Sequence, residues 1–81
     1  MDREQAIKIL KILKTAYPKF YADMNKQEAE DTINLWIDMF RHENVNLVVL
    51  AVKNLINTFK WPPTIADVKE EMYKLTEEEK D

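Results

Sequence analysis

Residues 59–69 read FKWPPTIADVK, and this stretch predicts a corner between two helices. The paired prolines at 62–63 end the first helix, because proline lacks a backbone N–H and holds the preceding residue in an extended conformation. Thr64 is suited to begin the next helix, since its hydroxyl can accept a hydrogen bond from a backbone N–H of the first turn. Asp67 adds negative charge near the positive end of that helix dipole. The chain is therefore expected to change direction here.

The segment before this corner is predicted to be a helix over about residues 45–58, capped by Asn44. Its β-branched beginning, VNLVVLAV at 45–52, could also be read as a buried strand. The helical spacing of apolar residues continues to Phe59, for more than about three turns, which is longer than most strands. Leu50 departs from that spacing and projects onto the polar side.

After the corner, the apolar spacing predicts a helix from about Ile65 to Leu75. Residues 76–81 read TEEEKD and contain no apolar side chain, and chain ends of this kind are usually poorly ordered. We therefore expect a helical domain over residues 1–75 and a flexible acidic tail over residues 76–81.

The first half of the chain predicts two more helices and a short connection. Each helix begins with a capping-box pattern, in which the cap residue and the residue three positions later exchange hydrogen bonds with backbone N–H groups: Asp2 with Gln5, and Asn25 with Glu28. The helices run to about Tyr17 and to about Arg41, and Pro18 ends the first one. The aromatic pair at 20–21 is expected to form a single helical turn that packs back onto the first helix.

The composition agrees with a small all-α protein. The chain has 81 residues, of which 46% are hydrophobic and 33% charged, so it is one globular domain rather than a disordered segment. It contains no glycine, which tight hairpin turns favour. We predict an all-α, small single-domain bundle of four main helices with a short extra helical turn, the helices at 26–41 and 45–58 being central. Trp36, Phe40 and Phe59 are assigned to the core, and Trp61 is expected to pack over the corner.

The residue inventory argues against an enzyme. There is no serine and no cysteine, which excludes disulfides, thiolate metal ligands and a Ser or Cys nucleophile. The single histidine, His42, stands at a helix end, where a solvated side chain is a simpler interpretation than catalysis. The carboxylates form neither a calcium-loop pattern nor a Glu-x-x-His pair. We therefore predict no catalytic residue, no cofactor and no metal.

Charge and hydropathy narrow the choice of partner. No apolar run approaches the ~20 residues that span a membrane, so no membrane contact is expected. The net charge of −3 is unfavourable for a non-specific nucleic-acid binder. Protein partners remain, and three kinds of residue are candidates for their contacts. They are a lysine strip on the outer face of the first helix, two apolar side chains that fall outside the helical core pattern, and the acidic run near the C-terminus: Lys8, Lys11, Lys14, Leu50, Trp61, Glu77, Glu78 and Glu79.

Each candidate also has a plainer explanation. The lysine strip could meet DNA phosphates or an acidic partner, but every amphipathic helix has a solvated face of this kind. Leu50 could simply contact the first helix. The acidic run is either a solvated tail or the beginning of a segment that binds a partner.

Several segments together resemble the bacteriophage replicative-helicase loader/inhibitor family. The resemblance extends over roughly residues 4–75 and is clearest in PPTIADVK at 62–69. Its other parts are Ala16-Tyr17-Pro18 with Phe20-Tyr21 and Met24, then Glu28-Ala29 leading to Leu35-Trp36 and Phe40, and then Val48, Ala51-Val52 and Leu55-Ile56. The segment at 62–69 is the most specific, since the others are helical patterns that small replication proteins share.

The resemblance implies a compact helical domain, without enzyme activity, that acts as an adaptor in the cytoplasm of the bacterial host. Members of the family bind a hexameric replicative helicase, hold it inactive and deliver it to an origin-binding protein on phage DNA. They contact the helicase largely through a flexible segment that follows the helical domain. We expect a monomer with no direct contact to nucleic acid.

The alternative is a small helix-turn-helix-like DNA-binding protein of a phage, with the corner at 62–63 setting the turn. The helix after the corner, or the lysine strip, would then meet DNA. Acidic residues outnumber lysines over residues 67–74, which is unfavourable beside phosphates.

Overall fold

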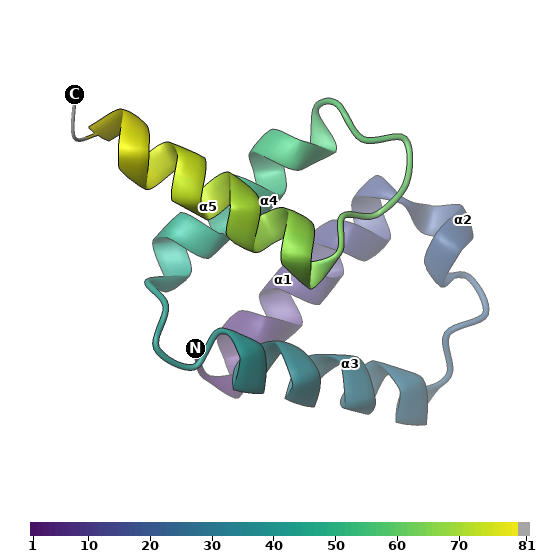
Figure 1. The fold of residues 1–81 in the computed structure, drawn as a ribbon. Helices are drawn as coiled ribbons and strands as arrows, with labels where there is room; N and C mark the ends of the chain where they lie inside the picture. The colour runs from purple at the N-terminus through teal and green to yellow at the C-terminus, as the bar shows by residue number, and fades with distance from the viewer. Residues whose placement is uncertain (80–81) are drawn as a thin grey trace.

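The computed structural model describes the backbone of residues 1–79 and the side chains of residues 1–77 (Figure 1). Helices account for 74% of the chain, and the described residues contain no strand, which confirms the all-α prediction. The helices are α1 Arg3–Ala16, α2 Pro18–Tyr21, α3 Lys26–Met39, α4 Val45–Ile56 and α5 Ile65–Glu79. Four longer helices and the short α2 are the bundle that the sequence predicts.

The first helix, α1, holds the bundle together. It packs against α2, α3 and α4, while α5 packs against α4. In Figure 1, α3 runs along the bottom, α1 passes behind it, and α4 and α5 lie above. Ala6 and Leu10 of α1 belong to a small core with α3, whereas Ile9 and Leu13 belong to the main core with α4. Because α1 is apolar on two sides, it takes the central place that we expected of the helix at 26–41.

The main core joins α1, α3, α4 and α5. Trp36 and Phe40 lie in it with ring centroids 5.1 Å apart, and Phe59 is partly buried against it, which confirms all three core assignments. Lys69 of α5 places its Nζ 5.4 Å from the centre of the Phe40 ring, within the range of a cation–π contact. The C-terminal end of α3 therefore reaches α5 through side chains.

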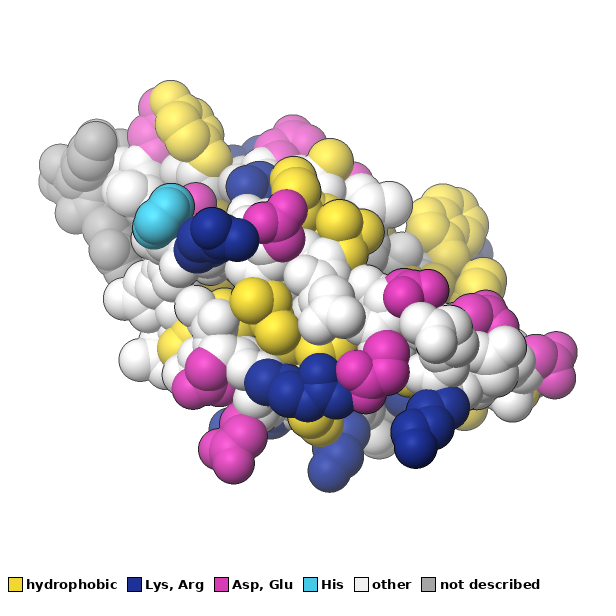
Figure 2. All heavy atoms as spheres, turned by 90° about the horizontal axis from the view of Figure 1, so that it is seen from below, with side chains coloured by type: hydrophobic (Ala, Val, Ile, Leu, Met, Phe, Trp, Pro, Cys, Tyr) yellow, Lys and Arg dark blue, Asp and Glu magenta, His cyan; other side chains and the backbone are white. Residues whose placement is uncertain are grey.

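The apolar face of α3 is wider than the surface it buries. Leu35 and Met39 are exposed on α3, and Ala16 at the end of α1 is also exposed. The other helices contact α3 along Ile33 and Trp36 and leave its outer side open to water. The view from below, where α3 lies, shows hydrophobic side chains in separate groups among charged ones (Figure 2).

The caps form as predicted, with one difference. Asp2 Oδ1 accepts from the Gln5 N–H and the Gln5 side chain accepts from the Asp2 N–H, both at 2.9 Å. Asn25 Oδ1 accepts from the N–H of Glu28 at 2.8 Å, but the Glu28 side chain does not complete the box among the described contacts. Asn44 caps α4. These hydrogen bonds satisfy N–H groups that the first turn of a helix leaves without partners.

The corner between α4 and α5 spans residues 57–64 and is tied to α1. The Tyr17 hydroxyl donates a 2.9 Å hydrogen bond to the backbone carbonyl of Phe59, and burial raises the pKa of that hydroxyl. Thr64 and Asp67 form a complete capping box. The Thr64 N–H donates to Asp67 Oδ2 at 2.9 Å, and the Asp67 N–H donates to Thr64 Oγ1 at 3.1 Å. The prediction that Trp61 packs over the corner is wrong: its side chain is 62% exposed, whereas Pro63 is the buried residue of this segment.

Three helix ends differ from the prediction, the first being that of α3, which lies at Met39 rather than near Arg41. α4 ends at Ile56 rather than Thr58, and α5 continues to Glu79 rather than ending near Leu75. Glutamate is a good helix former, so the chain needs no apolar contact to extend α5 past the core. Phe20 of α2 is exposed rather than packed inward, and its ring makes an edge-to-face contact with that of Tyr17, at 6.3 Å between ring centroids. Residues 80–81 of the predicted tail lie outside the described residues.

A surface ion pair joins α1 to α3. Arg3 donates a hydrogen bond to the carboxylate of Glu30, and both side chains remain largely solvated. This hydrogen bond lowers the pKa of the Glu30 carboxyl and raises the pKa of Arg3. Exposed pairs of this kind contribute little to stability, so the helices are held mainly by their apolar faces.

Candidate partner-binding surfaces

A groove between α1 and α4 is the most distinctive feature of the surface. Residues of α1 that recur at helical spacing form one wall, and the last turn of α4 forms the other. The floor is apolar and the rim is basic, with polar side chains between them: Lys8, Lys11, Ile12, Thr15, Ala16, Lys53, Ile56 and Asn57. The groove is open to solvent along its length, so it suits an extended surface of a partner rather than an enclosed small molecule.

The lysines of this groove are not engaged in the ion pairs of the described surface. Among the described side chains, none of Lys8, Lys11 and Lys53 forms an ion pair with a carboxylate. Their positive charge therefore faces solvent in a chain whose net charge is −3. Such a separation of charge concentrates a local positive potential over the groove, which attracts anionic groups of a partner.

The structure divides the predicted lysine strip. Lys8 and Lys11 line the groove, whereas Lys14 is exposed and does not line it. Lys53 joins the strip from α4, although the sequence reading did not select it. Only the packing of α1 on α4 brings these lysines together, because their separation along the chain carries no signal of proximity.

A second, smaller hollow continues beyond the end of the groove. Its lining includes Ala16, which the two share, together with Tyr17, Phe20, Lys19 and Lys60. Two further lysines and an exposed aromatic ring therefore extend the same combination of basic and apolar side chains toward α2 and the corner. The sequence reading missed Phe20 as a surface residue because an aromatic pair after a proline was expected to pack inward.

The two apolar candidates are both exposed. Leu50 is 48% exposed on α4, one turn before Lys53, and Trp61 is exposed at the corner. Leu50 is therefore not part of the buried core, and nearly half of its surface is open to solvent. Tyr73 of α5 is exposed to a similar degree as Trp61 and was not predicted. Single exposed apolar residues are common, so none of these side chains defines a site by itself.

Acidic side chains gather on a different part of the molecule. A hollow between α4 and α5 is lined by Asp67, Glu70 and Glu71, and Asn54 Nδ2 donates to Glu71 Oε2 at 3.4 Å. Glu77 is exposed further along α5. The other two members of the predicted acidic run, Glu78 and Glu79, belong to α5, but their side chains lie outside the described residues.

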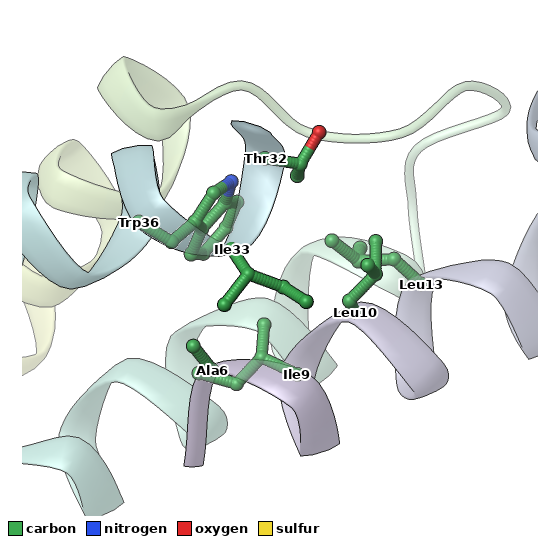
Figure 3. Close-up of a pocket in the computed structure, with 7 residues that line it drawn as sticks. All are labelled: Ala6, Ile9, Leu10, Leu13, Thr32, Ile33 and Trp36. Atoms are coloured by element: carbon green, nitrogen blue, oxygen red, sulfur yellow. The ribbon is translucent and has the colours of Figure 1, made fainter. Parts of the chain in front are cut away.

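A fourth concave region, between α1 and α3, is core rather than site. Figure 3 shows the side chains of α1 and α3 that line it: Ala6, Ile9, Leu10, Leu13, Thr32, Ile33 and Trp36. These side chains fill the space between the helices, which leaves no room for even one water molecule. The apolar faces of α1 and α3 therefore complete each other without a ligand.

The described residues also contain no cluster of three or more His, Cys, Asp or Glu side chains that could hold a metal ion. His42 is exposed in the turn after α3. Within the same part of the chain, no helix is long and apolar enough to cross a membrane. The described surface carries a basic and apolar groove, exposed apolar side chains and acidic side chains on α5.

Comparison with known proteins gives one result. A family model, that of the N-terminal domain of a phage helicase loader/inhibitor, matches residues 1–69. This match includes α1 to α4, the corner at 57–64 and the capping box that begins α5. Comparison with curated proteins and with solved structures finds no match. Since the family model matches most of the chain, the protein belongs to the family of phage helicase loader/inhibitor N-terminal domains.

Proposed function

We propose that this chain is a non-enzymatic adaptor in phage DNA replication, which binds the replicative helicase of the bacterial host and inhibits or loads it. The observation that carries the proposal is the family match over residues 1–69. The adaptor acts in the host cytoplasm as a monomer. Its helicase partner is a hexamer, and an origin-binding protein of the phage is the second partner, to which the helicase is delivered.

The mechanism is mass action at a protein surface. An adaptor that binds one state of the helicase stabilises that state in proportion to its occupancy, and handover to the origin complex releases it. Such a mechanism requires exposed contact residues and no reactive group. The exposed side chains of Leu50, Trp61 and Glu77 and the groove lysines support this mechanism.

Co-elution on a sizing column tests the proposal. The chain is mixed with the host's hexameric replicative helicase, with and without ATP, and the DNA-stimulated ATPase activity of the helicase is measured on the same mixtures. The expected result is a shift of the chain into the helicase peak and a stoichiometric change in ATPase activity. Separate elution at saturating helicase, together with unchanged ATPase activity, would refute the proposal.

Paired surface variants locate the contact. Trp61→Ala and Leu50→Ala each remove an exposed apolar side chain and should weaken co-elution without changing the melting temperature. Tyr73→Ala is the matched control, because its ring is 69% exposed on α5 and is not among the predicted contacts. Equal binding by all three variants would exclude Leu50 and Trp61 as contacts.

The helix-turn-helix alternative receives less support. The connection between α4 and α5 occupies residues 57–64, whereas the turn of that motif has about 3–4 residues. The helix after the corner also presents Asp67, Glu70 and Glu71, which would repel phosphates. A salt-sensitive shift with a phage-origin duplex, and none with the helicase, would favour the DNA-binding alternative.

A further inference from the structure

We propose that the groove between α1 and α4 binds an acidic amphipathic helix of a partner protein. This inference goes beyond the helicase contact proposed above. It depends on the geometry and charge of the groove and not on the family match. A negative result for peptide binding would therefore leave the helicase proposal standing, and a negative result for helicase binding would leave this one standing.

The shape of the groove favours a helix. Its α1 wall extends from Lys8 to Ala16, which is about 12 Å at 1.5 Å per residue, or a little over two turns. Ile12 and Ala16 lie one turn apart on this wall, and Ile56 faces the same hollow from α4. An amphipathic helix presents apolar residues at i, i+3, i+4 and i+7, which covers a similar length of about 10.5 Å. The apolar floor therefore fits the apolar stripe of a third helix.

The rim of the groove selects the charge of that helix. Lys8 and Lys11 stand on one side and Lys53 on the other, and no described carboxylate pairs with them. Lys19 and Lys60 continue the positive charge past Ala16. Glutamate or aspartate residues that flank the apolar stripe of a bound helix would meet these lysines from both sides.

Two other occupants fit less well. The floor is apolar, and none of its lining residues is an aromatic side chain on which a base could stack, so a nucleic acid would meet the lysines through its phosphates alone and leave the apolar floor uncovered. A second copy of this chain could offer its acidic helix α5. The apolar stripe of α5, including Val68 and Met72, is however already buried in its own core.

A designed peptide is the probe for the groove. It has about four helical turns, leucine at i, i+3, i+4 and i+7, and glutamate at most other positions, with blocked ends. Titration into the ¹⁵N-labelled chain should shift amide resonances of α1 between Lys8 and Ala16 and of the last turn of α4. A second peptide, with lysine in place of each glutamate, should not bind.

Charge-reversal variants supply the decisive comparison. The triple variant Lys8→Glu, Lys11→Glu, Lys53→Glu should weaken peptide binding at least about tenfold, since three attractive contacts become repulsive. Ala16→Gln, which places a polar side chain on the floor, should also weaken it. Lys14→Glu is the matched control, because Lys14 is exposed on the same helix but does not line the groove.

All these positions are exposed, so the variants should keep the circular dichroism spectrum and melting temperature of the parent chain. Four results would overturn the proposal: no binding at about 1 mM peptide, equal binding of the lysine peptide, resonance shifts outside the groove, or an equal effect of Lys14→Glu. Binding of duplex DNA in place of the peptide would assign the groove to nucleic acid. If the parent chain forms a dimer that the triple variant dissociates and Lys14→Glu does not, and no peptide binds, the groove would be assigned to a second copy of the chain.

Discussion

Replacing Tyr17 with phenylalanine tests how the corner is held against α1. The Tyr17 hydroxyl donates to the Phe59 carbonyl at 2.9 Å, and the ring is 7% exposed. Tyr17→Phe keeps the ring and removes only the donor. A hydrogen bond of this kind contributes about 0.5–1.5 kcal/mol to the free energy of unfolding, and the cost approaches about 3 kcal/mol if the carbonyl is left buried without a partner. For a domain of this size each kcal/mol lowers the melting temperature by about 4–8 °C.

The same hydroxyl predicts a loss of stability at high pH. Burial raises the pKa of Tyr17 in the folded chain above its unfolded value of about 10. The contribution of the neutral hydroxyl is therefore fully present below the unfolded pKa and is lost as the pH rises through the folded pKa. Tyr17→Phe should remove part of this alkaline loss. Burial also raises the pKa of Tyr21, so some alkaline loss should remain in the variant.

Urea unfolding followed by tryptophan fluorescence measures both effects. Trp36 is buried and Trp61 is exposed, so a Trp61→Phe background makes Trp36 the only reporter. Tyr73→Phe is the control, because its hydroxyl belongs to an exposed ring and makes no described hydrogen bond. Both variants are compared with the parent chain from neutral pH to pH about 11. If Tyr17→Phe changes the free energy of unfolding no more than Tyr73→Phe does over this range, the hydrogen bond does not hold the corner.

Trp36→Ala should lower the free energy of unfolding by about 3–5 kcal/mol, since the indole is buried in the main core, while Trp61→Ala should change it by no more than about 0.5 kcal/mol; urea titration compares the two. Thr64→Ala removes the cap of α5 and should cost about 1 kcal/mol in the same assay, with Thr64→Ser recovering most of it. Because Arg3 lowers the pKa of Glu30, that carboxylate stabilises the fold above its unfolded pKa and loses this contribution as the pH falls through its folded pKa. In Glu30→Gln, the free energy of unfolding should therefore fall less steeply as the pH is lowered, and high salt should have the same effect on the parent chain.

The elements of this fold were predictable where the forces that form them are local. Capping depends on residues three positions apart, so the beginnings of α1, α3, α4 and α5 follow from the sequence. Helical spacing likewise placed Trp36 and Phe40 in the core. The C-terminal ends of the helices were harder to predict. An extension such as the last turn of α5 depends on weak helix propensities summed over several residues, and no single residue indicates where it stops.

The candidate surfaces show the opposite case. The sequence placed Lys8, Lys11 and Lys14 on one outer face, but it could not show that Lys53 stands beside the first two and that Lys14 does not. Nor could it show that Trp61 is exposed while Pro63 is the buried residue of this segment. Each of these facts depends on how helices pack, and packing is set by many contacts between distant residues.

By itself the sequence determined the all-α class, the caps, the corner and the family, because periodicity, capping chemistry and the match over residues 1–69 are properties of the chain in order. Only the tertiary structure decided that α1 is the central helix and that its outer face joins α4 in a basic, apolar groove. The physical reason is that an apolar stripe shows that a helix must be covered but not by which neighbour. That choice depends on the fit of whole surfaces, which form only when the chain is folded.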